Sequence, residues 1–165
     1  MERFSTERLI AERLCEDHLA DLVALHLDPG VSRYLGGVRT AEATKAYLAV
    51  AIEHWDRRGF GLWALRTQDG AFVGRAGIRH AVVEGVPEFE VVYALKRDCW
   101  GRGLASEIVS ALIEMARTRL RLPSLVALIV IGNDASCRVI EKAGFVRERT
   151  MQLRGDEVVV YRSSQ

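Results

Sequence analysis

The chain alternates between short apolar runs, which are typical of strands, and longer segments whose apolar residues recur every three or four positions, as on one helix face. Seven segments predict strands: residues 9–14, 62–66, 72–80, 89–95, 125–131, 144–149 and 158–162. Four segments predict helices: residues 17–27, 40–58, 102–120 and 133–142. This order predicts a mixed α+β fold, with antiparallel strands first and then a parallel, right-handed crossover around the third helix.

A glycine-rich turn, Cys99-Trp100-Gly101-Arg102-Gly103-Leu104-Ala105, joins the strand at 89–95 to the third helix. Two glycines one residue apart let the backbone bend without a Cβ in the way, so that N–H groups converge at the positive end of the helix dipole. Such a point attracts phosphate, and ligands of mixed sheets bind where the connectivity changes. We predict a phosphate-binding turn. Arg97 and Arg102 beside it either add charge for an acidic ligand or are simply solvated.

Composition and charge are those of an ordinary soluble globular protein. The 165 residues are 49% hydrophobic and 27% charged, with a net charge of +1, and we expect a single domain over residues 1–165. The balanced charge indicates neither a nucleic-acid surface nor a membrane surface.

Three widely spaced cysteines without a CxxC pair favour a reducing, cytoplasmic location. The four histidines share no metal-ligand spacing, so no metal is expected.

Three motifs in this order carry a family resemblance: Thr6-Glu7-Arg8-Leu9, the stretch from Trp100 to Glu107, and the stretch from Gly132 to Phe145. Over nearly its whole length the chain resembles the GNAT superfamily of acyl-CoA-dependent N-acyltransferases. Within it, the chain is most similar to the branch of ribosomal-protein N-terminal (alanine) acetyltransferases. The resemblance implies a central mixed, mostly antiparallel sheet of about seven strands, flanked by four helices, with a splayed central strand pair.

The resemblance also implies a coenzyme A site. The backbone of the turn would hold the pyrophosphate through Trp100, Gly101, Arg102, Gly103, Leu104 and Ala105. Pantetheine would pair with the backbone of Tyr93, Ala94 and Leu95 and bond to Asn133, and Ser136 would lie near the thioester sulfur. Two positions depart from the superfamily: Trp100 stands where Gln or Arg often opens the loop, and Ile140 replaces a tyrosine that protonates the thiolate in many members.

Acyl transfer to an amine needs a neutral amine, a stabilised oxyanion and a proton for the departing thiolate. Glu90 is our first choice as general base and Glu88 our second, since alternation places both on the strand face of Val92. The alternative for these carboxylates is a cross-strand ion pair with Arg75 or Arg79. Glu107, near the helix start, instead satisfies the helix dipole or pins a neighbouring loop.

Other polar residues have two interpretations each. Ser136 is the candidate general acid, or else an ordinary first-turn serine. Asn133 binds pantetheine, caps the fourth helix, or does both. Arg138 reaches a CoA phosphate or pairs with Glu141 or Asp134. Tyr34 and His80 are expected to line the acceptor pocket, whereas Cys99, Trp55 and Trp63 are expected in the core.

Three functions fit these observations. The first is an N-acetyltransferase that moves an acetyl group from acetyl-CoA to a primary amine, either a protein N-terminus or a small molecule, by direct attack in a ternary complex. The second is a non-catalytic acyl-CoA-binding module. The third is a dinucleotide-binding oxidoreductase in which Gly101-Arg102-Gly103 is part of a GxGxxG motif. Ser106 stands in place of the third glycine of that motif and weakens this interpretation. The sequence is compatible with a homodimer as well as with a monomer.

Overall fold

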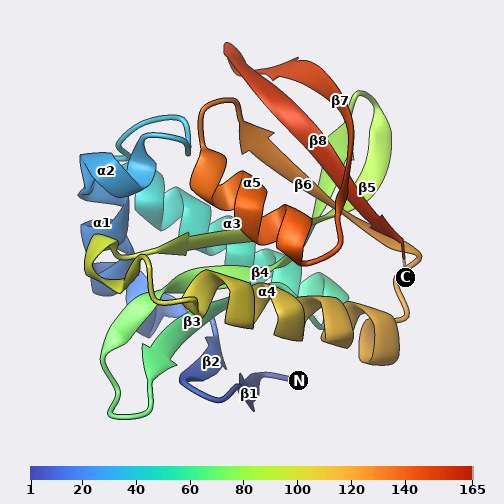
Figure 1. The fold of residues 1–165 in the computed structure, drawn as a ribbon. Coiled ribbons are helices and arrows are strands. Elements are labelled where there is room, and N and C mark those ends of the chain that lie inside the picture. Colours follow the sequence, from blue (N-terminus) through green and yellow to red (C-terminus); the bar gives the residue numbers. More distant parts are fainter. Residues whose placement is uncertain (165) are drawn as a thin grey trace.

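The computed structural model describes residues 1–164 and shows them built around one eight-stranded sheet of order β1-β2-β3-β4-β5-β6-β8-β7 (Figure 1). The strands are β1 (Arg3–Ser5), β2 (Leu9–Arg13), β3 (Leu62–Thr67), β4 (Phe72–Val83), β5 (Val86–Leu95), β6 (Ser124–Val130), β7 (Val146–Leu153) and β8 (Asp156–Ser164). Neighbouring strands are antiparallel except for β5 and β6, which are parallel. The predicted mixed, mostly antiparallel sheet with one parallel crossover is therefore confirmed.

Helices cover both faces of this sheet. They are η1 (Glu16–His18), α1 (Leu19–Leu27), α2 (Pro29–Ser32), α3 (Ala41–Arg58), η2 (Arg97–Cys99), α4 (Leu104–Met115), η3 (Ala116–Leu120) and α5 (Asp134–Lys142). In Figure 1, α4 and α5 lie in front of the sheet and α3 lies behind it. Ile108 and Leu112 of α4 are fully buried in the larger core cluster, whereas Leu22 of α1 and Leu48 of α3 pack with Ala64 of β3 in a second one.

Several elements differ from the prediction. The three-residue strand β1 was not expected, because its place depends on pairing with β2 and not on a pattern of its own. Directly after the predicted helix 17–27, the chain begins the short helix α2, in which Asp28 accepts hydrogen bonds from the Gly30 and Val31 amides. The predicted strands 72–80 and 89–95 are longer in the structure, reaching Val83 and starting at Val86, so that a tight turn joins them in one β4–β5 hairpin. The third helix changes to a π-helical turn after Met115.

The central strand pair, β5 and β6, separates along its length. Their ladder holds one register pair, Glu90 with Val126, and the strands part beyond it. The Lys96 amide donates to the Val73 carbonyl (2.8 Å), so alternation along the antiparallel ladder turns the backbone groups of Tyr93 and Leu95 away from β4, toward β6. The predicted splay is confirmed, and it leaves part of the β5 backbone facing a slot.

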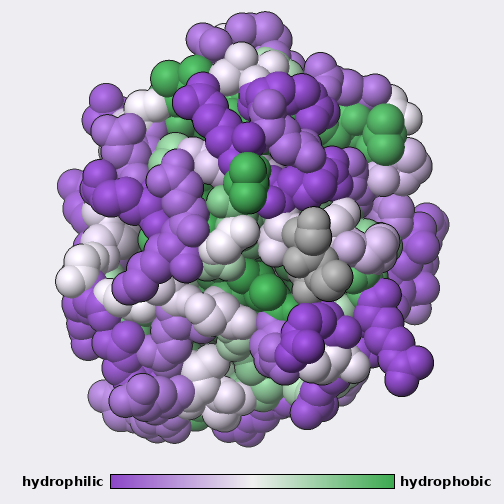
Figure 2. Space-filling model, turned by 45° about the vertical axis from the view of Figure 1, so that its right-hand side comes forward, coloured by the Kyte–Doolittle hydropathy of each residue, from purple (hydrophilic) through white to green (hydrophobic). Residues whose placement is uncertain are grey.

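The surface has no single large apolar region on the face drawn in Figure 2, where polar side chains predominate and apolar ones form small, separate patches. None of the helices formed by residues 1–164 is long and apolar enough to cross a membrane.

Candidate active site

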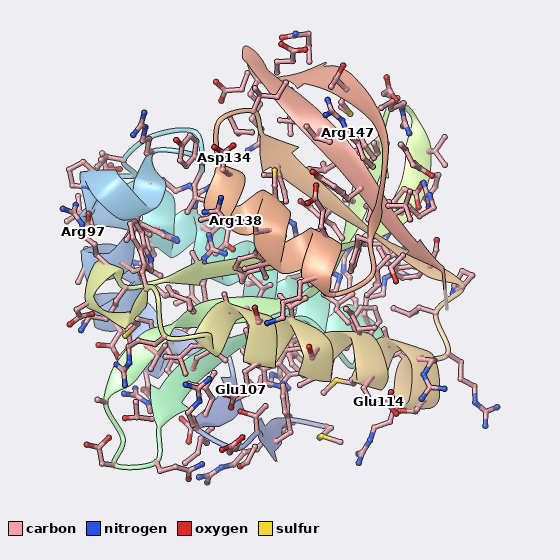
Figure 3. The ribbon with its side chains drawn as sticks, in the orientation of Figure 1. Arg97, Glu107, Glu114, Asp134, Arg138 and Arg147 are labelled. Carbon is pink, nitrogen blue, oxygen red and sulfur yellow. The ribbon has the colours of Figure 1, made fainter. Side chains whose placement is uncertain are left out.

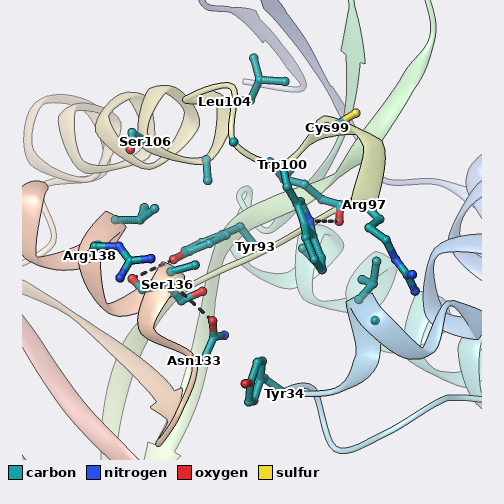
Figure 4. Close-up of a pocket in the computed structure, with 18 of the residues that line it drawn as sticks. Tyr34, Tyr93, Arg97, Cys99, Trp100, Leu104, Ser106, Asn133, Ser136 and Arg138 are labelled. Carbon is teal, nitrogen blue, oxygen red and sulfur yellow. Dashed lines mark hydrogen bonds between the residues drawn. The ribbon is translucent and has the colours of Figure 1, made fainter.

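A cavity of about 690 Å³ opens where the glycine-rich turn meets the ends of other elements. Its walls come from the segment 30–35 around α2, from the end of β5, from the first turn of α4 and from the N-terminal half of α5. Figure 4 shows Trp100, Tyr93, Asn133 and Tyr34 arranged around it. All residues of the predicted phosphate-binding turn except Arg102 line this cavity.

The turn has the geometry that the glycines predict. Gly101 (φ 69°) and Gly103 (φ 77°) adopt left-handed conformations that a residue with a Cβ rarely takes. Gly103 is the N-cap of α4, and no side chain caps this helix. The first amides of α4 therefore keep their hydrogen-bonding capacity for a ligand, and the positive end of the helix dipole adds to it. This end of the cavity suits the pyrophosphate of coenzyme A.

Glu107, in the first turn of α4, anchors the turn to the start of the chain. Its Oε1 accepts hydrogen bonds from Thr6 Oγ1 (2.5 Å) and the Arg8 amide (2.8 Å), and its Oε2 accepts one from Arg8 Nε (2.7 Å). Arg8 Nη1 also donates to the Arg102 carbonyl (2.7 Å). Burial raises the pKa of Glu107, but these hydrogen bonds outweigh burial and hold the pKa below its ordinary value. Figure 3 shows Glu107 on the side of α4 toward β2. Its predicted role in pinning a neighbouring segment is confirmed.

The backbone of β5 offers fewer free groups than the resemblance implies. Ala94 lies opposite Arg75 in the β4–β5 ladder, and its backbone groups face β4. Ala94 therefore lines the cavity without offering a free backbone group to a ligand. The Leu95 carbonyl accepts a hydrogen bond from Trp100 Nε1 (2.9 Å). Tyr93 thus remains as the position in this stretch whose amide and carbonyl both face the slot.

The start of α5 and the end of β5 both line the cavity. Asn133 Oδ1 accepts a hydrogen bond from the Ser136 amide (3.3 Å), so Asn133 does cap the helix. The Tyr93 hydroxyl donates to the Ser136 carbonyl (3.4 Å), and burial raises the pKa of Tyr93 to about 12. Ser136 Oγ makes no hydrogen bond with any residue of 1–164. Arg138 lines the same cavity, and no carboxylate of residues 1–164 lies within 4.0 Å of its guanidinium.

A second cavity, of about 150 Å³, continues from the slot toward α3. It shares Tyr34, Leu35, Tyr93, Asn133 and Ser136 with the first cavity, so these residues stand where the two meet. The hydroxyl of Tyr34 is held by a hydrogen bond to the Gly132 carbonyl (3.1 Å). Tyr34 therefore lies where the two cavities meet.

Glu90 lines the second cavity and is 5% exposed. Arg79 lies directly across the ladder, donates a hydrogen bond from Nε to Glu90 Oε2 (2.8 Å), and forms an ion pair in which Nη2 lies 2.8 Å from the same oxygen. The expected cross-strand pair is thus present. Oε1 receives no hydrogen bond from the described residues, so one carboxylate oxygen is still available to the cavity.

Glu88 and His80 do not reach either cavity, against expectation. Both Glu88 oxygens accept hydrogen bonds from Arg162 (2.6 and 3.1 Å), which lower the pKa of Glu88. His80 donates its amide to His54 Nε2 (3.0 Å) and packs its ring on Phe89. Alternation gives the correct strand face for Glu88, but it lies on the closed side of the Glu90–Val126 pair, before β5 and β6 separate.

Three residues that the sequence places in the core are buried in the structure. Trp55, Trp63 and Cys99 are buried, as predicted, and burial raises the pKa of the Cys99 thiol.

Arg75, which the sequence predicts only as a partner for Glu90 or Glu88, is 3% exposed and lines the second cavity. An arginine between Gly74 and Ala76 on a buried strand was the signal that could have identified it.

Comparisons with known proteins agree with this geometry. The model of the acetyltransferase (GNAT) domain matches residues 8–146. YkkB of Bacillus subtilis (strain 168) is 30% identical over 140 residues, which cover 81% of this chain and 78% of YkkB.

Solved structures share the fold over almost the whole chain. An acetyltransferase from Agrobacterium tumefaciens str. C58 is 26% identical, with a TM-score of 0.88 and coverage of 100% of this chain and 95% of the other. RimL, a ribosomal L7/L12 alpha-N-protein acetyltransferase solved with coenzyme A, is 21% identical, with a TM-score of 0.80 and coverage of 99% and 98%; this likeness is one of fold. The family match sets aside the oxidoreductase alternative. The chain belongs to the GNAT family of acetyltransferases, enzymes that transfer an acyl group from acetyl-CoA.

Proposed function

We propose that this enzyme transfers the acetyl group of acetyl-CoA to a primary amine by direct attack in a ternary complex. The observation that carries the proposal is the meeting of two cavities at Tyr93, Asn133 and Ser136. One cavity begins at the uncapped amides of α4, and the other contains the carboxylate of Glu90. Donor and acceptor can therefore approach the slot from opposite sides and react without a covalent enzyme intermediate.

The first cavity suits the donor along its length. The amides that follow Gly101 and Gly103 would bind the pyrophosphate, and Arg138, which has no carboxylate partner in residues 1–164, would add charge for a phosphate. Pantetheine would lie in the slot against the backbone of Tyr93 and the side chain of Asn133. The acetyl carbonyl would then accept a hydrogen bond from the Tyr93 amide, and preorganised donors of this kind lower a barrier by about 3 kcal/mol.

Two side chains supply the proton transfers. Glu90 Oε1, facing the second cavity, would accept the proton of the amine directly or through water, while Arg79 holds Oε2. The Ser136 hydroxyl, which has no other partner among the described residues, would donate to the departing thiolate. An α-amine, with an ordinary pKa of about 7.7 to 8.0, needs less help from Glu90 than a lysine amine near 10.4.

The test is release of free coenzyme A thiol from acetyl-CoA with and without an added amine. We expect release that depends on the amine and saturates with both substrates, and an N-acetylated product by mass spectrometry. Stabilisation of the fold by coenzyme A without turnover on any amine would instead support a binding module. A burst of thiol release before the amine is added would contradict direct attack.

A further inference from the structure

The second cavity contains a buried arginine without an acidic partner. Arg75, on β4, is 3% exposed, and no carboxylate of residues 1–164 lies within 4.0 Å of its guanidinium. Its Nε donates to His26 Nε2 (3.1 Å), which leaves both terminal nitrogens without an acceptor in that range. A buried charge of this kind is costly unless an anion compensates it.

The neighbouring histidine does not provide that anion. His26 Nε2 accepts the hydrogen bond from Arg75, so the proton of the neutral ring is on Nδ1, which lies 3.0 Å from Thr44 Oγ1. Burial, with Arg75 and Arg39, lowers the pKa of His26 to about 3. The acid that lines the same cavity near the slot, Glu90, is already paired with Arg79. No carboxylate of residues 1–164 therefore pairs directly with the positive charge of Arg75.

Two further groups extend this cluster. Arg39 Nη1 lies 3.5 Å from the same His26 nitrogen, and the guanidinium groups of Arg39 and Arg75 lie 4.9 and 4.8 Å from the ring centre of Tyr47. The Tyr47 hydroxyl is buried and has no hydrogen-bond partner among residues 1–164. All three side chains line the second cavity. Arg39 Nη2 donates to the Leu35 carbonyl (3.3 Å), so the donors without a partner in residues 1–164 are the terminal nitrogens of Arg75 and the Tyr47 hydroxyl.

The chemistry of these donors selects a carboxylate. A planar guanidinium matches the two oxygens of a carboxylate, and a phenol can add a third hydrogen bond. The charged side chains that line the cavity are Arg39, Arg75, Arg79 and Arg154 against Glu90 and Asp156, a balance that repels a polyamine. The volume of about 150 Å³ is below the roughly 300–1,000 Å³ of pockets for drug-sized ligands, which favours a small acceptor.

We propose that the acceptor is a small amino acid whose carboxylate binds Arg75, Arg39 and Tyr47 and whose amine points to Glu90 and the slot. This inference rests on the proposed acetyl transfer. It places recognition of the acceptor at one end of the second cavity and chemistry at the other, where the cavity meets the donor.

The test compares three matched sets of acceptors in the thiol-release assay: free L-amino acids, their primary amides, and the amines that remain when the carboxyl group is removed. We expect the best amino acid to exceed its amide and its decarboxylated amine in kcat/KM by roughly 10- to 100-fold, the effect of losing a charged hydrogen bond. Equal activity on the decarboxylated amines, or higher activity on neutral N-terminal peptides, would overturn the inference while leaving acetyl transfer intact. No turnover on any amine would count against the proposed function itself.

Two variants test the cluster without removing the most buried arginine. Tyr47→Phe removes a hydroxyl that has no partner in the described residues, so we expect an unchanged or higher melting temperature and a KM for the amino acid raised roughly 10-fold. Arg39→Gln should raise that KM further, with the KM for acetyl-CoA unchanged. Arg57→Gln, an exposed position on α3, is the control and should behave as wild type. Wild-type KM values in both Tyr47→Phe and Arg39→Gln would overturn the assignment.

Discussion

Arg79 holds one oxygen of Glu90, Oε2, across the β4–β5 ladder, with a hydrogen bond from Nε and an ion-pair contact from Nη2. The pairing keeps the carboxylate in place, and Oε1 receives no hydrogen bond from residues 1–164. We predict that Glu90→Gln lowers kcat/KM by roughly 100-fold or more, as loss of a general base does, and removes the acidic limb of its pH profile.

Glu88→Gln is the matched control for this prediction. Glu88 is on the same face of β5 but is held by Arg162 outside both cavities. The variant should weaken stability, because Arg162 loses a partner, and leave the pH profile of kcat/KM unchanged. A wild-type profile in Glu90→Gln would remove Glu90 as the base.

Substitution of Gly103 tests the phosphate-binding turn. With φ at 77°, a β-branched residue is strained, and the amides at the start of α4 would shift. Gly103→Val is therefore expected to weaken coenzyme A binding at least roughly 10-fold, measured by calorimetry, while circular dichroism shows an intact fold.

A second glycine variant distinguishes the effect of backbone strain from the effect of losing a ligand-binding site. Gly70, in the β3–β4 turn, also has a positive φ, 93°, and open space around its Cβ position. Gly70→Val should lose comparable stability and keep wild-type affinity for coenzyme A. Equal loss of affinity in both variants would attribute the effect to general destabilisation.

Ser136 is expected to protonate the thiolate. Ser136→Ala should lower kcat roughly 10-fold or more, with little change in KM for acetyl-CoA. Ser106→Ala, which lines the first cavity but not the second, should leave kcat unchanged. The Tyr93 hydroxyl is the alternative donor, and a pKa of about 12 keeps it protonated throughout the assay range. If Tyr93→Phe and not Ser136→Ala abolishes turnover, the proton comes from Tyr93.

His26 predicts a dependence of stability on pH. Its pKa is lowered in the folded state from 6.5 to about 3, so between these values the unfolded chain binds a proton that the folded chain does not. Stability is therefore full above about pH 6.5 and falls as the pH drops, by at most about 1.4 kcal/mol per pH unit from this group. Urea denaturation at several pH values should show this slope, and His26→Gln should flatten it. An identical slope in the variant would contradict the assignment.

The order of elements could be predicted because local patterns determined it. Ile108 and Leu112 recur at helical spacing and are fully buried. Alternation gave Arg75 or Arg79 as the cross-strand partner of the β5 carboxylates, and Arg79 is the partner of Glu90. The glycine-rich turn was recognisable because its backbone function depends on Gly101 and Gly103 themselves. These features are all contained within a few consecutive residues or within one hairpin.

The features that escaped prediction depend on distant segments. Strand β1 exists through its pairing with β2. The pinning role of Glu107 was predicted, but its partner Arg8, which lies far away in the sequence, was not. The arginine cluster gathers His26 of α1, Arg39 before α3 and Arg75 of β4 around one small space. No spacing along the sequence indicates that these three side chains meet.

The most direct measurement of the central claim is a crystal structure of the protein with coenzyme A. We expect the pyrophosphate on the amides between Gly101 and Ala105, and pantetheine between β5 and β6 with its sulfur beside Ser136. Coenzyme A bound elsewhere, or those amides covered by side chains with the slot closed, would contradict it.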